Sequence, residues 1–124
     1  MTPNPVQTDP DCLFCKIASR QIPSRKVYED DEIYAFHDIA PWAPVHFLII
    51  PKLHLPSMAQ VTEQHEGLLG RILGLVPKLA LQEGCNPYPN GGYRLVTNTG
   101  AEGGQEVRHL HFHVMGGTRP WLRG

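Results

Sequence analysis

The sequence predicts an α+β fold, in which a five-stranded antiparallel sheet carries one long helix on one face and a short helix lies near the N-terminus. Two observations predict it: five short segments have strand composition, and one longer segment has apolar residues at helical spacing. The connections are short, and twelve glycines and twelve prolines supply many turns. Short connections favour antiparallel neighbours over parallel ones.

The chain begins with a tail and a short helix. Residues 1–10 contain three prolines and no apolar run, which predicts a flexible N-terminal tail without the features of a secretory signal. Asp11 can cap a helix over residues 12–20, and Pro23 follows soon after as a stop. The remainder, residues 11–124, is long enough for one domain with its own core.

Five segments have the composition of strands. The third, Val-His-Phe-Leu-Ile-Ile, is a β-branched apolar run between prolines and predicts a central strand. The first two flank the acidic pair Asp30 and Asp31, which suits a two-residue hairpin turn. The expected strands are residues 26–29, 32–37, 45–50, 93–98 and 108–115.

Residues 62–82 predict the long helix. Thr62 can serve as its N-cap, and Gly84 stands just past its end, where glycine is favoured. Pro77 removes one backbone donor, so we expect a kink there. The apolar residues that follow the three-four spacing are Leu68, Leu69, Ile72, Leu75, Val76 and Leu79.

Charge and composition limit the expected partners and location. Eleven Lys and Arg residues against twelve Asp and Glu residues give a net charge of -1, so we expect no nucleic-acid partner. The longest apolar stretch, residues 68–81, is shorter than the roughly 20 residues that span a bilayer, so we expect no membrane partner. Three cysteines cannot all pair within one chain, which favours a reducing compartment and predicts a cytoplasmic protein.

The densest chemistry lies in the segment His-Leu-His-Phe-His-Val. Side chains alternate along a strand, so His109, His111 and His113 should share one face. A single buried histidine is commonly a core residue, but three on one face beside an apolar opposite face argue against that interpretation. The residues expected to face the core are Leu110, Phe112 and Val114.

The three histidines admit two chemical interpretations. In a strand, the first and last have Cα atoms about 13 Å apart, so only an adjacent pair fits one metal comfortably. The alternative is that one imidazole attacks an electrophile while a neighbour handles protons, since neutral imidazole is both nucleophile and base near pH 7. Such a pair suits an anionic phosphorus centre, where positive groups stabilise the charge that develops on the phosphoryl oxygens.

A Gly-rich stretch just upstream supports this interpretation. Gly100, Gly103 and Gly104 allow backbone N–H groups to turn toward an anion, and Gln105 can donate its amide to a bridging or leaving atom. Glycine runs are mostly ordinary turns, so the signal depends on the neighbouring histidines. Together they form a candidate phosphate cradle.

With these motifs, the sequence resembles the histidine triad (HIT) family, whose signature is His-x-His-x-His followed by apolar residues. It resembles most closely the HINT branch of nucleoside phosphoramidate hydrolases. The resemblance implies an α+β fold, a homodimer that joins the two sheets, and hydrolysis of adenosine or guanosine 5′-phosphoramidates through a nucleotidyl-histidine intermediate. It runs from about residue 11 to 117 through residues 36–39, 46–52, 98, 103–105 and 109–117.

The resemblance also implies a role for individual residues. His111 would be the nucleophile on the α-phosphorus, His113 would bind phosphate oxygens, and Gln105 would be the third catalytic residue. Asp38 would hold the ribose hydroxyls, because a carboxylate accepts two hydrogen bonds. The purine would lie between apolar residues that pattern alone would assign to the core: Phe14, Ile17, Phe36 and Ile39. The phosphate would be lined by Asn98, Gly104 and Gln105.

Cys12 and Cys15 are spaced as Cys-x-x-Cys at a helix start. A thioredoxin-like redox pair needs a preceding strand in a βαβ unit, which is missing. A zinc half-site needs two more ligands, and His54 and His109 are the natural candidates, an arrangement that resembles that of zinc-bearing relatives. The alternative is a pair of buried thiols.

Three features of the sequence are compatible with more than one role. Glu106 stands where many members of the family carry Ser, so the preferred leaving group is undecided. His46 begins the central strand and either orients an active-site imidazole or serves structure alone. The alternatives to phosphoramidate hydrolysis are hydrolysis of dinucleoside polyphosphates and a non-catalytic nucleotide-binding or scaffold module.

Overall fold

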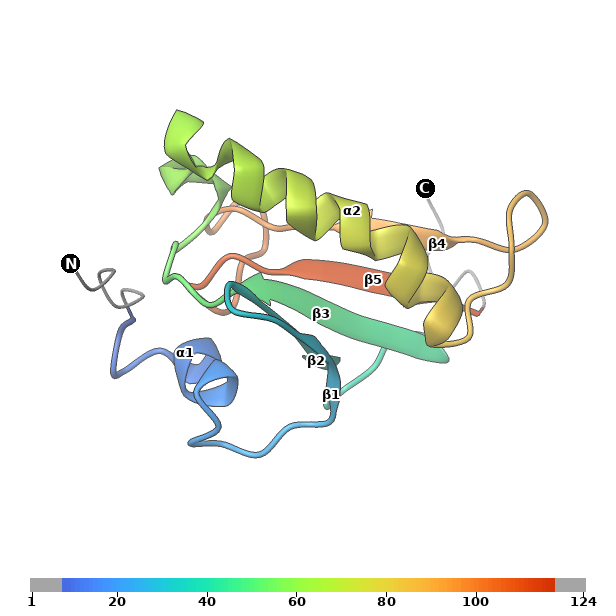
Figure 1. Ribbon diagram of the computed structural model, residues 1–124, viewed down its shortest axis with the longest axis horizontal. Coiled ribbons are helices and arrows are strands. Elements are labelled where there is room, and N and C mark those ends of the chain that lie inside the picture. Colours follow the sequence, from blue (N-terminus) through green and yellow to red (C-terminus); the bar gives the residue numbers. More distant parts are fainter. Residues whose placement is uncertain (1–7, 118–124) are drawn as a thin grey trace.

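The computed structural model describes residues 8–117, whose five strands form one antiparallel sheet in the order β1-β2-β3-β5-β4 (Figure 1). This confirms the predicted fold class. Residues 1–7 of the expected tail and residues 118–124 of the expected domain lie outside the described part. The strands are β1 Lys26–Glu29, β2 Ile33–His37, β3 Val45–Pro51, β4 Tyr93–Val96 and β5 Phe112–Gly116. The helices are α1 Leu13–Ala18 and α2 Glu66–Gln82, with 3-10 turns η1 Met58–Gln60 and η2 Glu63–His65.

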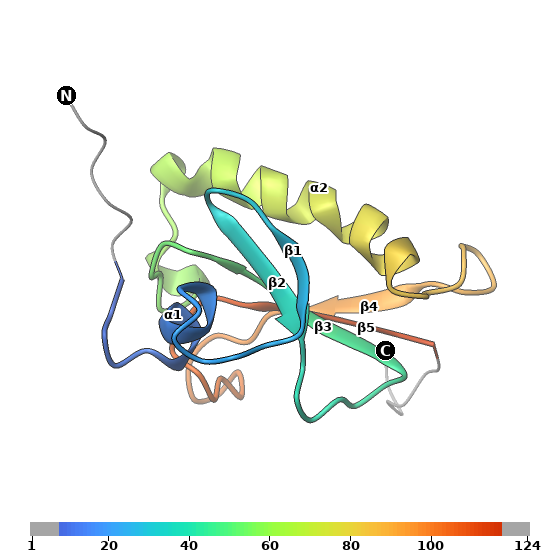
Figure 2. The same ribbon diagram turned by 60° about the horizontal axis from the view of Figure 1, so that its bottom comes forward.

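Alternation along β3 divides the interior into two layers. Phe47 and Ile49 point to the core under α2, while Leu48 and Ile50 belong to a second apolar cluster that includes α1. Helix α2 lies along the sheet in Figure 1, and the segment that leads into β5 passes beside α1 in Figure 2. The sheet is therefore covered by the long helix on one face, as predicted, and partly by the short helix on the other.

The strand expected over residues 108–115 begins only at Phe112. The register explains the late start, because continuing the pairing of Ile49 with Phe112 would set Pro51, which has no N–H, opposite Leu110. Leu110 instead donates its N–H to the carbonyl of Leu55, at 2.6 Å. Two of the three histidines therefore precede the strand. The strand expected over residues 93–98 is also shorter and ends at Val96.

One predicted cap and one predicted turn differ in detail. Cys12 rather than Asp11 is the N-cap of α1, and its Sγ accepts the N–H of Cys15 at 3.3 Å. The β1–β2 connection has three residues rather than two, because Oδ1 of Asp30 accepts the N–H groups of Glu32 and Ile33, both at 2.8 Å. The geometry of an Asx turn thus replaces the predicted hairpin turn.

The long helix also starts later than predicted. Thr62 caps the 3-10 turn η2, and α2 begins after it at Glu66. The helix continues through Pro77, and Gly84 takes the positive φ of 106° expected just past its end. Within residues 8–117, we find no helix with the length and apolar content needed to span a membrane.

Candidate active site and metal centre

The alternation predicted for the three histidines is confirmed. Leu110, Phe112 and Val114 all belong to the core under α2. The imidazoles project to the other side, where the ring centroids of His111 and His113 are 4.9 Å apart and that of Phe14 lies 5.0 Å from His111. The alternation thus extends past the start of β5 into the segment before it.

The backbone fixes which nitrogen of His111 carries the proton. Nδ1 lies 2.7 Å from the carbonyl oxygen of His109, and because a carbonyl only accepts, Nδ1 must donate. Burial lowers the pKa of His111, although the bond to His109 and the charge of Asp38 oppose the shift, so the ring is neutral at pH 7. Nε2 therefore keeps its lone pair and can act as a nucleophile.

His113 is neutral as well. Burial and the neighbouring rings of His111 and His46 lower its pKa to about 4. Its Nδ1 lies 3.0 Å from Nε2 of His46, which the sequence left as either an orienting or a structural residue. The two rings form a contact between β3 and β5, which are hydrogen-bonded neighbours in the sheet.

The apolar residues expected to hold a purine are only partly brought together. Phe14, Ile17 and Phe36 are buried in one cluster, where the rings of Phe14 and Phe36 meet edge to face at 5.5 Å. Ile39 lies outside this cluster and is fully exposed, in the loop after β2. Asp38 precedes it and uses Oδ1 to accept the N–H of Ala40, at 2.8 Å. Ile39 therefore exposes its apolar side chain in the loop after β2 and is not part of the buried cluster.

The Gly-rich loop is closed by its own hydrogen bonds. Asn98 donates its amide to the carbonyl of Gly103 at 2.7 Å, and Gly104 has a positive φ of 79°. The Gln105 amide nitrogen donates to the carbonyls of Pro56, at 2.6 Å, and Val107, at 3.0 Å. Both amide hydrogens are thus used by the backbone, so Gln105 must break one of these bonds before it can donate to a substrate.

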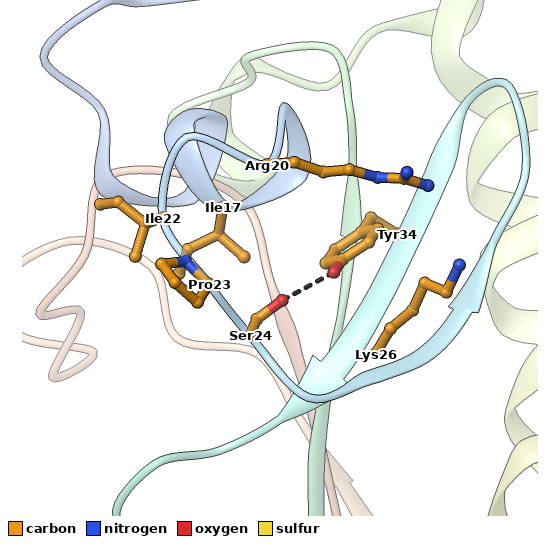
Figure 3. Close-up of a pocket in the computed structure, with 7 residues that line it drawn as sticks. All are labelled: Ile17, Arg20, Ile22, Pro23, Ser24, Lys26 and Tyr34. Atoms are coloured by element: carbon orange, nitrogen blue, oxygen red, sulfur yellow. Dashed lines mark hydrogen bonds between the residues drawn. The ribbon is translucent and has the colours of Figure 1, made fainter.

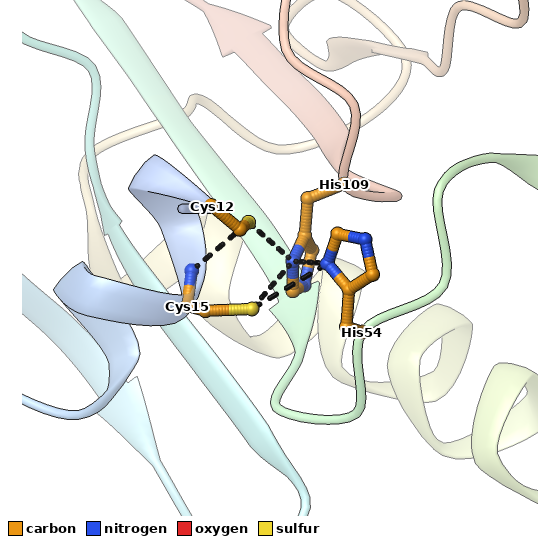
Figure 4. Close-up of side chains that lie close together, drawn as sticks. All are labelled: Cys12, Cys15, His54 and His109. Carbon is orange, nitrogen blue, oxygen red and sulfur yellow. Dashed lines mark hydrogen bonds between the residues drawn. The ribbon is translucent and has the colours of Figure 1, made fainter. Parts of the chain in front are cut away.

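The four predicted metal ligands converge from three segments of the chain (Figure 4). One ligand atom from each of Cys12, Cys15, His54 and His109 lies within 4.8 Å of the others. Nδ1 of His109 is 3.2 Å from Sγ of Cys12 and 3.2 Å from Nδ1 of His54, and Sγ of Cys15 is 3.4 Å from the same His54 atom. A tetrahedral site with bonds of about 2.0–2.3 Å separates its ligands by about 3.5 Å, so these distances suit one ion.

The surroundings also fit a metal. His109 donates from Nε2 to the carbonyl of Pro51 at 2.7 Å, which leaves Nδ1 as a lone pair facing the thiols. A backbone carbonyl on the outer nitrogen is typical of histidines that bind metals. Two sulfur and two nitrogen ligands are a donor set that zinc prefers, and they fill all four positions. In the absence of an ion, burial raises the pKa of Cys15 to about 11.

A separate cavity of about 280 Å³ lies beside α1 (Figure 3). None of the three histidines lines it, and the Ser24 and Tyr34 hydroxyls meet inside it at 2.6 Å. It touches the buried aromatic cluster through Ile17 and Tyr34. Its full lining is Ile17, Arg20, Ile22, Pro23, Ser24, Lys26 and Tyr34.

Some contacts of the site could not be read from the sequence. The carbonyl of Pro51 holds His109, and the hydroxyl of Thr97 donates to the carbonyl of His111 at 2.8 Å. A backbone carbonyl leaves no signal in residue type, and Thr97 lies 14 residues from its partner. A threonine near the end of a predicted strand is too common to have indicated this role.

An α+β fold with one antiparallel sheet, together with three alternating histidines beside the ring of Phe14, defines a histidine triad protein. The HIT domain family matches residues 19–119. The chain is 48% identical over 107 residues to the purine nucleoside phosphoramidase of Escherichia coli (strain K12), covering 86% of this chain and 87% of that protein. It is 47% identical to HitA of Neisseria gonorrhoeae over 106 residues, covering 86% and 95% of the two chains.

The solved structures that resemble this chain belong to the same family as its relatives by sequence. The crystal structure of a HIT family hydrolase from Legionella pneumophila Philadelphia 1 superposes with a TM-score of 0.84 at 47% identity, covering 91% of this chain and 98% of that one. A histidine triad protein from Clostridium difficile gives the same TM-score at 41% identity, with 91% and 96% covered. The chain belongs to the HIT family, and it is a hydrolase of that family.

Proposed function

We propose that this protein hydrolyses purine nucleoside 5′-phosphoramidates to the nucleoside monophosphate and an amine. The observation that carries the proposal is the hydrogen bond from Nδ1 of His111 to the carbonyl of His109, since it directs a neutral lone pair on Nε2 away from the backbone. The similarity to a relative named purine nucleoside phosphoramidase supports the same chemistry.

The reaction proceeds in two displacements at phosphorus. Nε2 of His111 forms a bond to the α-phosphorus while the bond from phosphorus to the amine nitrogen breaks, and the departing amine takes up a proton from solvent. Water then attacks the nucleotidyl-histidine, the bond from phosphorus to Nε2 breaks, and one proton of the water returns to solvent, which releases the monophosphate and restores the neutral imidazole. His113 donates to the phosphoryl oxygens as negative charge develops there.

Different parts of the site bind the purine, the ribose and the phosphate of the substrate. The purine contacts Phe14, Ile17 and Phe36 from the buried cluster and is covered on its open side by the exposed Ile39. The ribose hydroxyls bind Asp38, whose carboxylate lies beside the histidines. The phosphate is lined by Asn98, Gly104 and Gln105, the last after its amide leaves a backbone carbonyl.

We further propose that Cys12, Cys15, His54 and His109 hold zinc as a structural ion. All four coordination positions are filled by the protein, so zinc supplies rigidity and no open position for substrate. The metal ties α1, which carries Phe14, to the residue whose carbonyl orients His111. Zinc binding requires reduced thiols, which supports a cytoplasmic location.

We also propose that the protein forms a homodimer through one edge of its sheet. Strand β4 is an edge strand, and its Tyr93 and Leu95 expose large apolar side chains. An apolar edge strand is suited to pairing with another strand. A second copy of this chain paired there would join the two sheets.

The test is turnover of a fluorogenic adenosine phosphoramidate by the wild type and by His111→Ala. We expect the variant to lose at least about a thousandfold in kcat/KM, because no other group can form the covalent bond. Rapid quenching of the wild type with substrate should reveal a mass increase of one nucleotidyl group. Equal rates for the two proteins would refute the nucleophile assignment.

Two comparisons separate the alternatives. Faster turnover of diadenosine tri- or tetraphosphate than of the phosphoramidate would favour a dinucleoside polyphosphate hydrolase. Tight AMP binding without an adduct or turnover would favour a nucleotide-binding module.

A further inference from the structure

Thr97 contacts the backbone of the proposed nucleophile from the neighbouring segment of the chain. Its hydroxyl donates to the carbonyl of His111 at 2.8 Å, in a half-buried hydrogen bond. Both residues lie just outside the sheet, because β4 ends at Val96 and β5 begins at Phe112. The last pair of the two strands is Val96 with His113. A side chain therefore holds the nucleophile at the point where the strand pairing stops.

The strand register shows which bond this hydroxyl replaces. Pairing continued by two residues beyond the last pair of β4 and β5 would set Asn98 opposite His111. A continued antiparallel ladder would then offer the carbonyl of His111 a backbone N–H from Asn98. Asn98 instead donates its side-chain amide to the carbonyl of Gly103 at 2.7 Å, at the start of the Gly-rich loop. The hydroxyl of Thr97 thus supplies the donor that the interrupted ladder would have supplied.

This bond fixes the peptide group next to the nucleophilic side chain. A carbonyl and the N–H that follows it belong to one planar peptide unit. Phe112, which carries that N–H, pairs with Ile49 of β3, and β5 lies between β3 and β4 in the sheet. Thr97 and β3 therefore hold the peptide between His111 and Phe112 from opposite sides. The ring itself is held by Nδ1, which donates to the carbonyl of His109 at 2.7 Å.

We propose that Thr97 is a positioning residue that holds His111 in the orientation from which Nε2 attacks the α-phosphorus. This inference rests on the proposed function, because the attack is a step of the proposed hydrolysis. The next residue, Asn98, is bonded to the Gly-rich loop, so two consecutive side chains place the nucleophile and the proposed phosphate-lining loop relative to each other. Loss of the hydroxyl would leave the carbonyl of His111 without this donor and allow the peptide and its ring to shift.

Two variants separate the hydroxyl from the volume of the side chain. Thr97→Val replaces the hydroxyl by a methyl group of similar size, whereas Thr97→Ser keeps the hydroxyl and removes the methyl group. We expect Thr97→Val to lower kcat roughly tenfold with little change in KM, because a displaced nucleophile weakens the transition state more than substrate binding. Thr97→Ser should retain most of the wild-type rate. Turnover of the fluorogenic adenosine phosphoramidate measures both.

Thr62→Val is the matched control for stability. It removes the same kind of hydroxyl outside the site, where Thr62 caps η2 by accepting the N–H of Gln64 at 3.3 Å. We expect Thr62→Val to keep wild-type kcat even where it lowers the midpoint of thermal unfolding, which circular dichroism measures for each variant. Wild-type kcat in a folded Thr97→Val would overturn the inference. An equal loss of kcat in Thr97→Ser or in Thr62→Val would overturn it as well.

A measurement without substrate separates this inference from the proposed function. In ¹⁵N–¹H spectra of the imidazoles, the Nδ1 proton of His111 should exchange with water faster in Thr97→Val than in the wild type, because the ring is held less firmly. An unchanged exchange rate would overturn the inference. A wild-type Thr97 hydroxyl proton that exchanges as fast as a free hydroxyl would also overturn it, even where Thr97→Val fails to fold. Absence of turnover by the wild type would refute the proposed function instead, and the exchange rates would still decide whether Thr97 holds the ring.

Discussion

At the scale of single residues, backbone carbonyls and N–H groups decide what each imidazole can do. His109 donates from Nε2 to Pro51, so its Nδ1 is free to bind a metal. His111 donates from Nδ1 to His109, so its Nε2 is free to react. Two histidines in one repeating pattern are therefore opposite tautomers. A neutral ring offers one donor and one acceptor, and each role follows from which nitrogen the backbone uses.

The hydrogen bonds of Gln105 to the backbone should stabilise the fold. Replacing it by Glu exchanges an amide donor for a carboxylate that would face the carbonyls of Pro56 and Val107. We expect the free energy of unfolding to fall by about 2 kcal/mol, since acceptors facing acceptors lose their hydrogen bonds. Urea unfolding measures the change, and Gln64→Glu, at an exposed position, is the control. Equal free energies of unfolding for the two variants would contradict a stabilising role for the hydrogen bonds from Gln105 to Pro56 and Val107.

At the scale of elements, the segment before β5 shows how tertiary contacts override a strand pattern. The sequence pattern correctly predicted which side chains share a face, because alternation needs only an extended chain. It did not predict where the ladder starts, because that depends on Pro51 of β3 and on the bond from Leu110 to Leu55. The short helix likewise begins at Leu13 with Cys12 as its N-cap, whose sulfur accepts the N–H of Cys15 while it faces His109.

Removal of zinc should loosen α1. We expect about one zinc per chain in protein purified without added metal, and treatment with a strong chelator should lower the midpoint of thermal unfolding by roughly 10 °C, because binding energy at a structural site is folding energy. AMP affinity should fall as well, since α1 carries Phe14 to within 5.0 Å of the His111 ring.

The matched variants for this site are Cys12→Ser and Cys85→Ser. Metal analysis should give less than about a tenth of an equivalent for the first and wild-type content for the second, because Cys85 lies in the core under α2 and outside the ligand group. Full zinc content in Cys12→Ser would refute the ligand assignment.

Glu29 forms ion pairs with Lys52 and Arg20, so the free energy of unfolding depends on pH. Its carboxylate accepts from Lys52 at 2.8 Å and from Arg20 at 2.6 Å, and these bonds lower its pKa to about 2. Because the pKa is lower in the folded state, this stabilisation is complete above about pH 4.5 and is lost as the pH falls toward 2.

The comparison of wild type with Glu29→Gln tests this contribution. We expect the wild type to be more stable by about 1 kcal/mol at neutral pH, and the difference to shrink between pH 4.5 and 2. Unfolding in urea at a series of pH values measures it. A difference that stayed constant over that range would contradict the ion-pair explanation.

At the scale of the whole molecule, the sheet has two different edges. Strand β1 presents Lys26, a charged residue of the kind that protects an edge, whereas β4 presents Tyr93 and Leu95. The proposed dimer therefore uses β4. The five-strand order also places β5, with its histidine, between β3 and β4, so an interface at β4 lies one strand away from the reacting residues.

Light scattering after size exclusion tests the dimer. The wild type should have about twice the mass of one chain at micromolar concentration, and Leu95→Lys should shift it to the monomer, because a charge on the apolar edge disfavours pairing. Met58→Lys, an exposed position on η1, is the control and should leave the mass unchanged. A wild-type monomer would refute the proposed homodimer.

Periodicity and residue chemistry are local properties, so the sequence alone predicts the fold class, the buried faces of the elements and the residue types of the proposed active site and metal site. The tertiary structure determines how these residues are used. It placed Cys12 against His109, 97 positions away, exposed Ile39, bound Gln105 to the backbone and set the tautomers of His109 and His111. The contacts of Cys12 with His109, of Gln105 with Pro56 and of His109 with Pro51 join segments that are 49 to 97 residues apart and that meet only once the sheet and α1 have packed together.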